Sequence, residues 1–138
     1  MLIKAFIVAL RAHKGQKDKA GKPYIFHPIT VSLHVSGIKR KEVALLHDVV
    51  EDTPITVSDL RTIGFGYDVV EAVNAITKRN GESYCEYLQR VKENDIAKDV
   101  KMSDLRHNCN LKRLKTVTDK DKSRVEKYIN AIDYLQQC

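Results

Sequence analysis

Apolar residues recur with helical spacing along nearly the whole chain, and this periodicity limits the possible folds more than any other feature. The periodic stretches predict eight helices, over residues 2–14, 29–36, 40–52, 57–64, 67–77, 84–93, 95–105 and 119–137. Ser and Thr three residues ahead of an acidic residue mark the starts of two of them, at Thr56 and Ser83. No alternating pattern is long enough for a sheet. The predicted class is therefore all-α, with at most a minor strand turn near residues 17–22.

Length and composition predict a single globular domain over residues 1–138. The apolar share of 43% is enough for a helical core around a pocket. No apolar run approaches the roughly 20 residues that cross a bilayer, so no membrane association is expected. Three widely spaced cysteines, Cys85, Cys109 and Cys138, form neither a disulfide framework nor a thiolate zinc motif. Reduced thiols of this kind predict a cytoplasmic protein.

The formal net charge of +6 comes from lysine-rich segments, mainly residues 14–22 and 98–127. A basic rim around an acidic centre suits a polyanionic small molecule such as a phosphorylated nucleotide. The alternative is a basic helical module that binds RNA without catalysis, and its binding would weaken steeply with salt. The chain contains no recognisable RNA-binding motif, which disfavours that alternative.

An acidic cluster stands inside an aliphatic run between residues 43 and 53, and it indicates a metal site. On a helix, His47 lies over Glu51 and Asp48 over Asp52, because residues four apart share a face. Buried carboxylates repel one another, and negative charge at a helix C-terminus opposes the macrodipole. A divalent cation held by His47 and Asp48 would relieve both costs and leave Glu51 and Asp52 to handle protons. The alternative is an acidic helix end that is simply solvated.

Further ligands have to come from elsewhere in the chain, since a metal site usually has three or four protein ligands. His27 precedes Pro28, which predicts an extended backbone whose ring projects into a pocket. Asp104 is a lone carboxylate on a helix with an apolar face, and Asn108 shares its side of that helix. The remaining histidines are predicted to be structural or, for His107, to serve the core or a cap.

Several motifs occur in an order that resembles the HD-domain (p)ppGpp hydrolases of the RelA/SpoT homologue family. They are Ala-His-Lys-Gly-Gln at residues 12–16, Pro-Tyr-Ile-Phe-His-Pro at 23–28, Leu-His-Asp-Val-Val-Glu-Asp-Thr at 46–53 and Lys-Met-Ser-Asp-Leu-Arg-His-Asn at 101–108. The resemblance implies a single-domain helical bundle of the HD type. It also implies metal ligation, here of Mn²⁺, with Fe²⁺ or Zn²⁺ as alternatives, by four residues: His27, His47, Asp48 and Asp104.

The same resemblance implies roles for the residues around the metal. Glu51 and Asp52 would position and deprotonate the attacking water. Substrate contacts would come from Lys19, Lys101 and Asn108. The implied reaction removes the 3′ pyrophosphate of ppGpp or pppGpp to give GDP or GTP, as in the small stand-alone alarmone hydrolases.

One residue departs from the family pattern and keeps a second function open. Asp18 stands where the family usually has arginine beside the base. This departure leaves the purine preference unsettled and motivates the alternative of a metal-dependent phosphohydrolase that acts on a different nucleotide.

Overall fold

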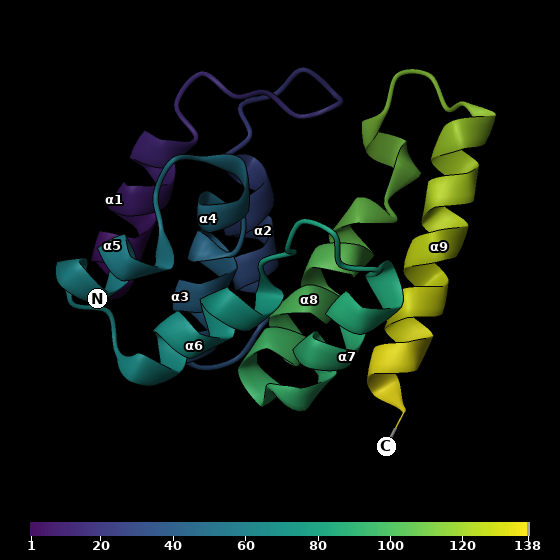
Figure 1. Cartoon of the computed structure of the whole chain (residues 1–138). Helices are drawn as coiled ribbons and strands as arrows, with labels where there is room; N and C mark the ends of the chain where they lie inside the picture. Colours follow the sequence, from purple (N-terminus) through teal and green to yellow (C-terminus); the bar gives the residue numbers. More distant parts are fainter. Residues whose placement is uncertain (138) are drawn as a thin grey trace.

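The computed structural model describes residues 1–137, with the side chain of Arg113 left aside, and within them it is all-helical as predicted (Figure 1). The helices are α1 (Leu2–Ala12), α2 (Phe26–Leu33), α3 (Ile38–Leu46), α4 (Val49–Asp52), α5 (Val57–Ile63), α6 (Tyr67–Ile76), α7 (Tyr84–Glu93), α8 (Asp95–Asn108) and α9 (Asp119–Gln136), with a 3₁₀ turn at Leu111–Arg113. In this part of the chain β pairing is limited to an isolated bridge between Lys17 and Pro23. Cys85 and Cys109 are free thiols, and Cys138 lies outside the described residues.

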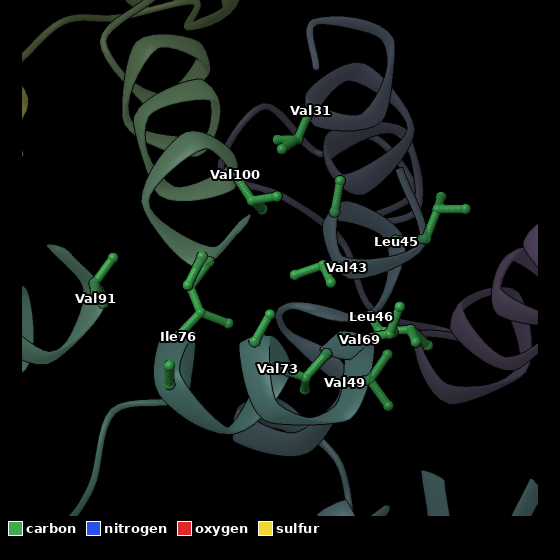
Figure 2. Close-up of a cluster of buried hydrophobic side chains, with 14 of the residues drawn as sticks. Val31, Val43, Leu45, Leu46, Val49, Val69, Val73, Ile76, Val91 and Val100 are labelled. Atoms are coloured by element: carbon green, nitrogen blue, oxygen red, sulfur yellow. The ribbon is translucent and has the colours of Figure 1, made fainter. Parts of the chain in front are cut away.

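The core is built around α3, which packs against α1, α2, α6 and α8. Figure 2 shows its aliphatic side chains meeting those of the neighbouring helices, with Val43 between Val31 of α2, Val100 of α8 and Val73 of α6. These side chains are fully buried, so each contributes roughly 1.5–3 kcal/mol of apolar transfer free energy. The packing fixes α2, α3 and α8 against one another, and these helices lead to the polar residues described below.

The predicted continuous helix over residues 40–52 is wrong, because it breaks at His47 and Asp48. Helix α3 ends at Leu46 and the single turn of α4 begins at Val49. The Nδ1 of the His47 ring donates to the carbonyl oxygen of Ala44 at 2.5 Å. In an uninterrupted helix this oxygen would accept from the amide of Asp48. The side chain of His47 thus replaces a backbone bond, and the break turns His47 and Asp48 toward the interior.

The extended backbone predicted for His27 is also wrong. Helix α2 begins at Phe26, so His27 and Pro28 both lie in its first turn. Proline is tolerated there because the amides of the first turn have no acceptor within the helix. The backbone nitrogen of His27 donates to the carbonyl oxygen of Tyr24 at 3.0 Å, which brings Tyr24 close to the helix start.

Helices α8 and α9 lie on the side of the molecule opposite α1, and α9 runs along α7 and α8 (Figure 1). The helix predicted over residues 95–105, with a continuation or a kink toward residue 115 left open, continues to Asn108. Helical spacing of the apolar residues predicts Ile129 in the buried stripe of α9, but Ile129 is 49% exposed, whereas Ala131 and Leu135 are buried. Helix α9 packs against α8 and α7, and Ile129 lies on the part of its surface that these contacts leave exposed. None of the described helices is both long and apolar enough to cross a membrane.

Candidate metal centre and substrate cavity

Two helices and the break between two others bring two histidines and two aspartates together in the interior. His27 comes from α2, His47 and Asp48 from the break between α3 and α4, and Asp104 from α8. Asp104 Oδ1 lies 2.7 Å from His27 Nε2 and 3.4 Å from His47 Nε2. Asp48 Oδ2 lies 3.1 Å from His47 Nε2 and 3.8 Å from His27 Nε2. The four side chains are thus neighbours, although 77 residues separate the first from the last. Asp48 is close to both imidazoles but is not part of the mutually close group formed by His27, His47 and Asp104.

The donor atoms of this cluster fit a divalent metal ion. The Nδ1 of His47 donates its proton to the carbonyl oxygen of Ala44, so in the neutral ring the Nε2 atom has no proton and presents a lone pair. This Nε2 is buried and has no hydrogen-bond partner among the described residues. A lone pair that faces carboxylate oxygens without a proton or cation between them is unfavourable. Two imidazole nitrogens and carboxylate oxygens form a ligand set typical of Mn²⁺, Fe²⁺ or Zn²⁺. His27, His47 and Asp104 place one ligand atom each within 4.8 Å of one another.

The pKa values of the buried groups also indicate that the carboxylates of the centre are stabilised by nearby positive charge. Burial would lower the pKa of His47, but Asp48 and Asp104 outweigh it and hold that pKa well above its usual range. Burial would raise the pKa of Asp104, but Lys101 and the two histidines keep it well below its usual range. Without a metal, an imidazolium supplies the cation that these carboxylates require. With a metal, the ion takes that place and the ring is neutral.

A second layer of side chains holds the proposed ligands in place. The Tyr24 hydroxyl donates to Asp48 Oδ2 at 2.5 Å, and the ammonium of Lys101 donates to Asp104 Oδ2 at 2.8 Å. The ring of His107 stacks on His27 with centroids 4.9 Å apart, and their Nδ1 atoms lie 2.6 Å apart. Contacts of this kind fix the orientation of metal ligands and their tautomers.

A cavity of about 350 Å³ opens beside His27. Its lining is basic, polar and partly aromatic, and comprises Lys17, Asp18, Lys19, Tyr24, His27, Asn108, Asn110, Leu111, Leu114, Asp121, Arg124, Val125 and Tyr128. Two of the predicted substrate contacts, Lys19 and Asn108, lie in this lining. Asn108 also donates from Nδ2 to Asp104 Oδ1 at 3.1 Å, which connects the cavity wall to the metal centre. The third, Lys101, is not in the lining, and its ammonium faces Asp104.

Glu51 and Asp52 lie on α4, just beyond the break that carries His47 and Asp48. Both residues lie at the surface with their carboxyl groups partly shielded from water, and Glu51 Oε2 accepts from the backbone nitrogen of Lys78 at 3.4 Å. Partial burial raises the pKa of Glu51. Partial burial raises the pKa of Asp52 as well, and the charge of Asp48 adds to the effect. Both groups are thus more basic than ordinary surface carboxylates, which suits proton acceptors.

Several residues that contribute to this site were not predicted from the sequence. Tyr24 belongs to the motif at residues 23–28, three residues before His27. This short spacing was the one sign in the sequence that Tyr24 lies near the same site as His27. His107 was expected in the core or a cap, yet it stacks on a proposed ligand. The cavity residues of α9 (Asp121, Arg124 and Tyr128) gave no sequence signal, because they meet the loop after α1 only through the tertiary fold.

Comparison with known proteins agrees with this fold and site. A protein-family model described as HD domain matches residues 5–128. Over 81 residues the chain is 42% identical to the bifunctional (p)ppGpp synthase/hydrolase SpoT of Escherichia coli (strain K12). Over an alignment of equal length it is 38% identical to a guanosine-3′,5′-bis(diphosphate) 3′-pyrophosphohydrolase of Vibrio cholerae. Each alignment covers 56% of this chain but only 11% of the relative, so this chain corresponds to a small part of those proteins.

A solved structure described as a metazoan ortholog of SpoT that hydrolyses ppGpp has the same fold. It superposes with a TM-score of 0.81 at 24% identity, and the match covers 98% of this chain and 85% of the other. The family match over most of the chain, together with the His and Asp cluster that the fold assembles, shows that this chain belongs to the HD domain family.

Proposed function

We propose that this protein is a metal-dependent hydrolase that removes the 3′ pyrophosphate from ppGpp and pppGpp, giving GDP or GTP and pyrophosphate. The observation that carries this proposal is the buried cluster of His27, His47 and Asp104 beside a cavity lined with lysine and arginine. The names of the relatives support the choice of substrate. We further propose that residues 1–138 act as one domain in the cytoplasm, as the cysteine usage suggests.

The proposed ligands are His27, His47, Asp48 and Asp104, and the proposed ion is Mn²⁺, with Fe²⁺ or Zn²⁺ as alternatives. When bound, such an ion polarises a phosphoryl oxygen and lowers the pKa of water toward neutrality. The histidines and aspartates fix its position, and Asn108 holds Asp104 from the cavity side.

Glu51 and Asp52 are the proposed proton acceptors. One of them takes a proton from water as the water oxygen attacks the phosphorus bonded to ribose O3′. The bond from phosphorus to O3′ then breaks, pyrophosphate leaves, and O3′ gains a proton. The raised pKa values of both carboxyl groups strengthen them as bases relative to ordinary acidic side chains.

Basic residues of the cavity offset the charge of the substrate. Lys19 and Asn108 line the cavity and are proposed to contact the nucleotide, with Asn108 near the sugar or a phosphate. Lys101 stays a predicted phosphate contact, with its ammonium beside Asp104 next to the metal position. Positive groups placed where the phosphates lie stabilise the charge that develops on them during the reaction.

The direct experiment incubates the Mn²⁺-loaded protein with ppGpp and measures GDP and pyrophosphate together. Equal amounts of the two products support the proposal. A protein that binds Mn²⁺ but releases no pyrophosphate contradicts it.

A metal-dependent phosphohydrolase of another nucleotide is the second candidate, because Asp18 lines the cavity. A panel of ppGpp, pppGpp and common nucleotides separates the two. Turnover without preference for ppGpp favours the second candidate.

A further inference from the structure

Tyr24 reaches the metal centre from the cavity side. Its hydroxyl donates to Asp48 Oδ2 at 2.5 Å. The same oxygen is 3.1 Å from His47 Nε2 and 3.8 Å from His27 Nε2. Tyr24 therefore contacts the carboxylate oxygen that faces the imidazoles, which is the oxygen placed to meet a metal ion.

Tyr24 is itself held in place by contacts outside the centre. Its backbone nitrogen donates to the carbonyl oxygen of Gln16 at 2.9 Å. Its ring packs on His13 with centroids 4.9 Å apart, and on His27 at 5.7 Å. His13 is buried, and its Nδ1 lies 2.9 Å from Gln16 Oε1. A donor clamped in this way directs Asp48 without having to be ordered by the metal itself.

We propose that Tyr24 is a positioning residue of the metal centre, which orients the Asp48 carboxylate so that Oδ2 is presented to the ion. A carboxylate oxygen has two lone pairs, so it can accept the tyrosine hydroxyl with one and meet a cation with the other. Without this hydrogen bond the Asp48 side chain regains rotational freedom, and the site loses part of its preorganisation. This inference rests on the proposed metal-dependent function.

The substitution that tests it is Tyr24→Phe, which removes the hydroxyl and keeps the ring that packs on His13 and His27. The matched control is Tyr134→Phe, which removes the same atom from a tyrosine of α9 that does not line the cavity. We expect Tyr24→Phe to weaken Mn²⁺ binding by about 10- to 100-fold, the usual effect of losing a second-layer partner. We expect Tyr134→Phe to bind Mn²⁺ like the wild type.

The measurement is the Mn²⁺ dissociation constant, determined by competition with a metallochromic chelator, alongside the melting temperature of each metal-free protein. Weaker binding in Tyr24→Phe with a melting temperature within a few degrees of the wild type supports the positioning role. Wild-type Mn²⁺ affinity in Tyr24→Phe overturns it. The readout needs no substrate. An inactive wild type that still binds Mn²⁺ would therefore contradict the proposed reaction alone.

Discussion

His47 shows at the scale of one residue how this centre is specified. Its Nδ1 is committed to the backbone at Ala44, so its Nε2 is directed at the carboxylates of Asp48 and Asp104. At 2% exposure the ring has almost no access to water that could satisfy that nitrogen. The residue therefore interrupts its own helix and in the same contact fixes the tautomer that a metal ligand needs.

Substitutions should separate the proposed ligands from the proposed bases. We expect Asp48→Ala to abolish both Mn²⁺ binding and turnover, because it removes a charged ligand from a buried site. We expect Glu51→Gln or Asp52→Asn to keep the metal while lowering kcat by about 10²- to 10⁴-fold. Metal content of the purified variants and the rate of pyrophosphate release test this. An active Asp48→Ala protein, or a metal-free Glu51→Gln protein, would reverse the assignments.

The pH dependence of turnover should report the proposed base. Burial raises the pKa of Glu51, so this group gains its proton at a higher pH than an ordinary glutamate does. Because a base acts only when deprotonated, kcat should fall as the pH is lowered through that raised pKa. The acid limb should therefore lie above the ordinary value of about 4.3. Profiles of kcat at saturating Mn²⁺, with metal content checked at each pH, measure it. A limb at or below the ordinary value argues against Glu51 as the base.

At the scale of single elements, α9 completes the cavity that the other helices leave open. Its first three turns supply Asp121, Arg124 and Tyr128 to the lining. A capping box starts the helix, in which Thr118 Oγ1 accepts from the Asp121 amide and the Asp121 carboxylate accepts from the Thr118 amide. The position of this cavity wall thus depends on whether the N-terminal turn of α9 stays folded.

Removing this cap should affect substrate binding more than chemistry. We expect Thr118→Ala to lower the free energy of unfolding by about 1 kcal/mol and to raise KM for ppGpp by fraying the first turn of α9. The control is Thr56→Ala, which removes the equivalent cap of α5, a helix outside the cavity. It should lose similar stability and keep its KM. Chemical denaturation and steady-state kinetics measure both, and an equal KM for the two variants would contradict the role of α9.

At the scale of the whole molecule, residues distant in sequence meet because the core around α3 aligns their helices. Val31, Val43 and Val100 pack together on the helices that carry His27, His47 and Asp104 (Figure 2). The apolar contacts stabilise the fold, and they also force acidic groups into the interior. Placing such groups there without a cation costs stability, since buried charges lose their hydration.

Metal binding should therefore stabilise the whole fold. A ligand that binds only the folded state raises the free energy of unfolding by about 2.7 kcal/mol at a concentration 100 times its dissociation constant. We expect Mn²⁺ to raise the melting temperature of the wild type and to leave that of His47→Ala unchanged. Differential scanning calorimetry with and without a chelator measures the shift. An equal shift in both proteins would show that Mn²⁺ binds elsewhere.

Local patterns in the amino-acid sequence are enough to predict the helical class, most helix positions and the start of α5 at Thr56, because these depend on local periodicity and local hydrogen bonds. Charged groups inside apolar runs also marked His47, Asp48, Asp104, Glu51 and Asp52 as candidates, whereas His27 was marked by the proline that follows it. The full set of four ligands came from the resemblance to the HD-domain hydrolases. The assigned roles of these residues stay predictions.

Three features depend on tertiary packing: the break after Leu46, the helical backbone of His27 and the exposure of Ile129. Each depends on a partner that is distant in sequence, or on which side of a helix packs against its neighbours. The periodicity of apolar residues predicts neither of these. The same holds for the contact of Tyr24 with Asp48 and for the approach of α9 to the cavity. Local patterns specify the elements, whereas the geometry of a site depends on how packed elements align, which is set by the sum of long-range contacts.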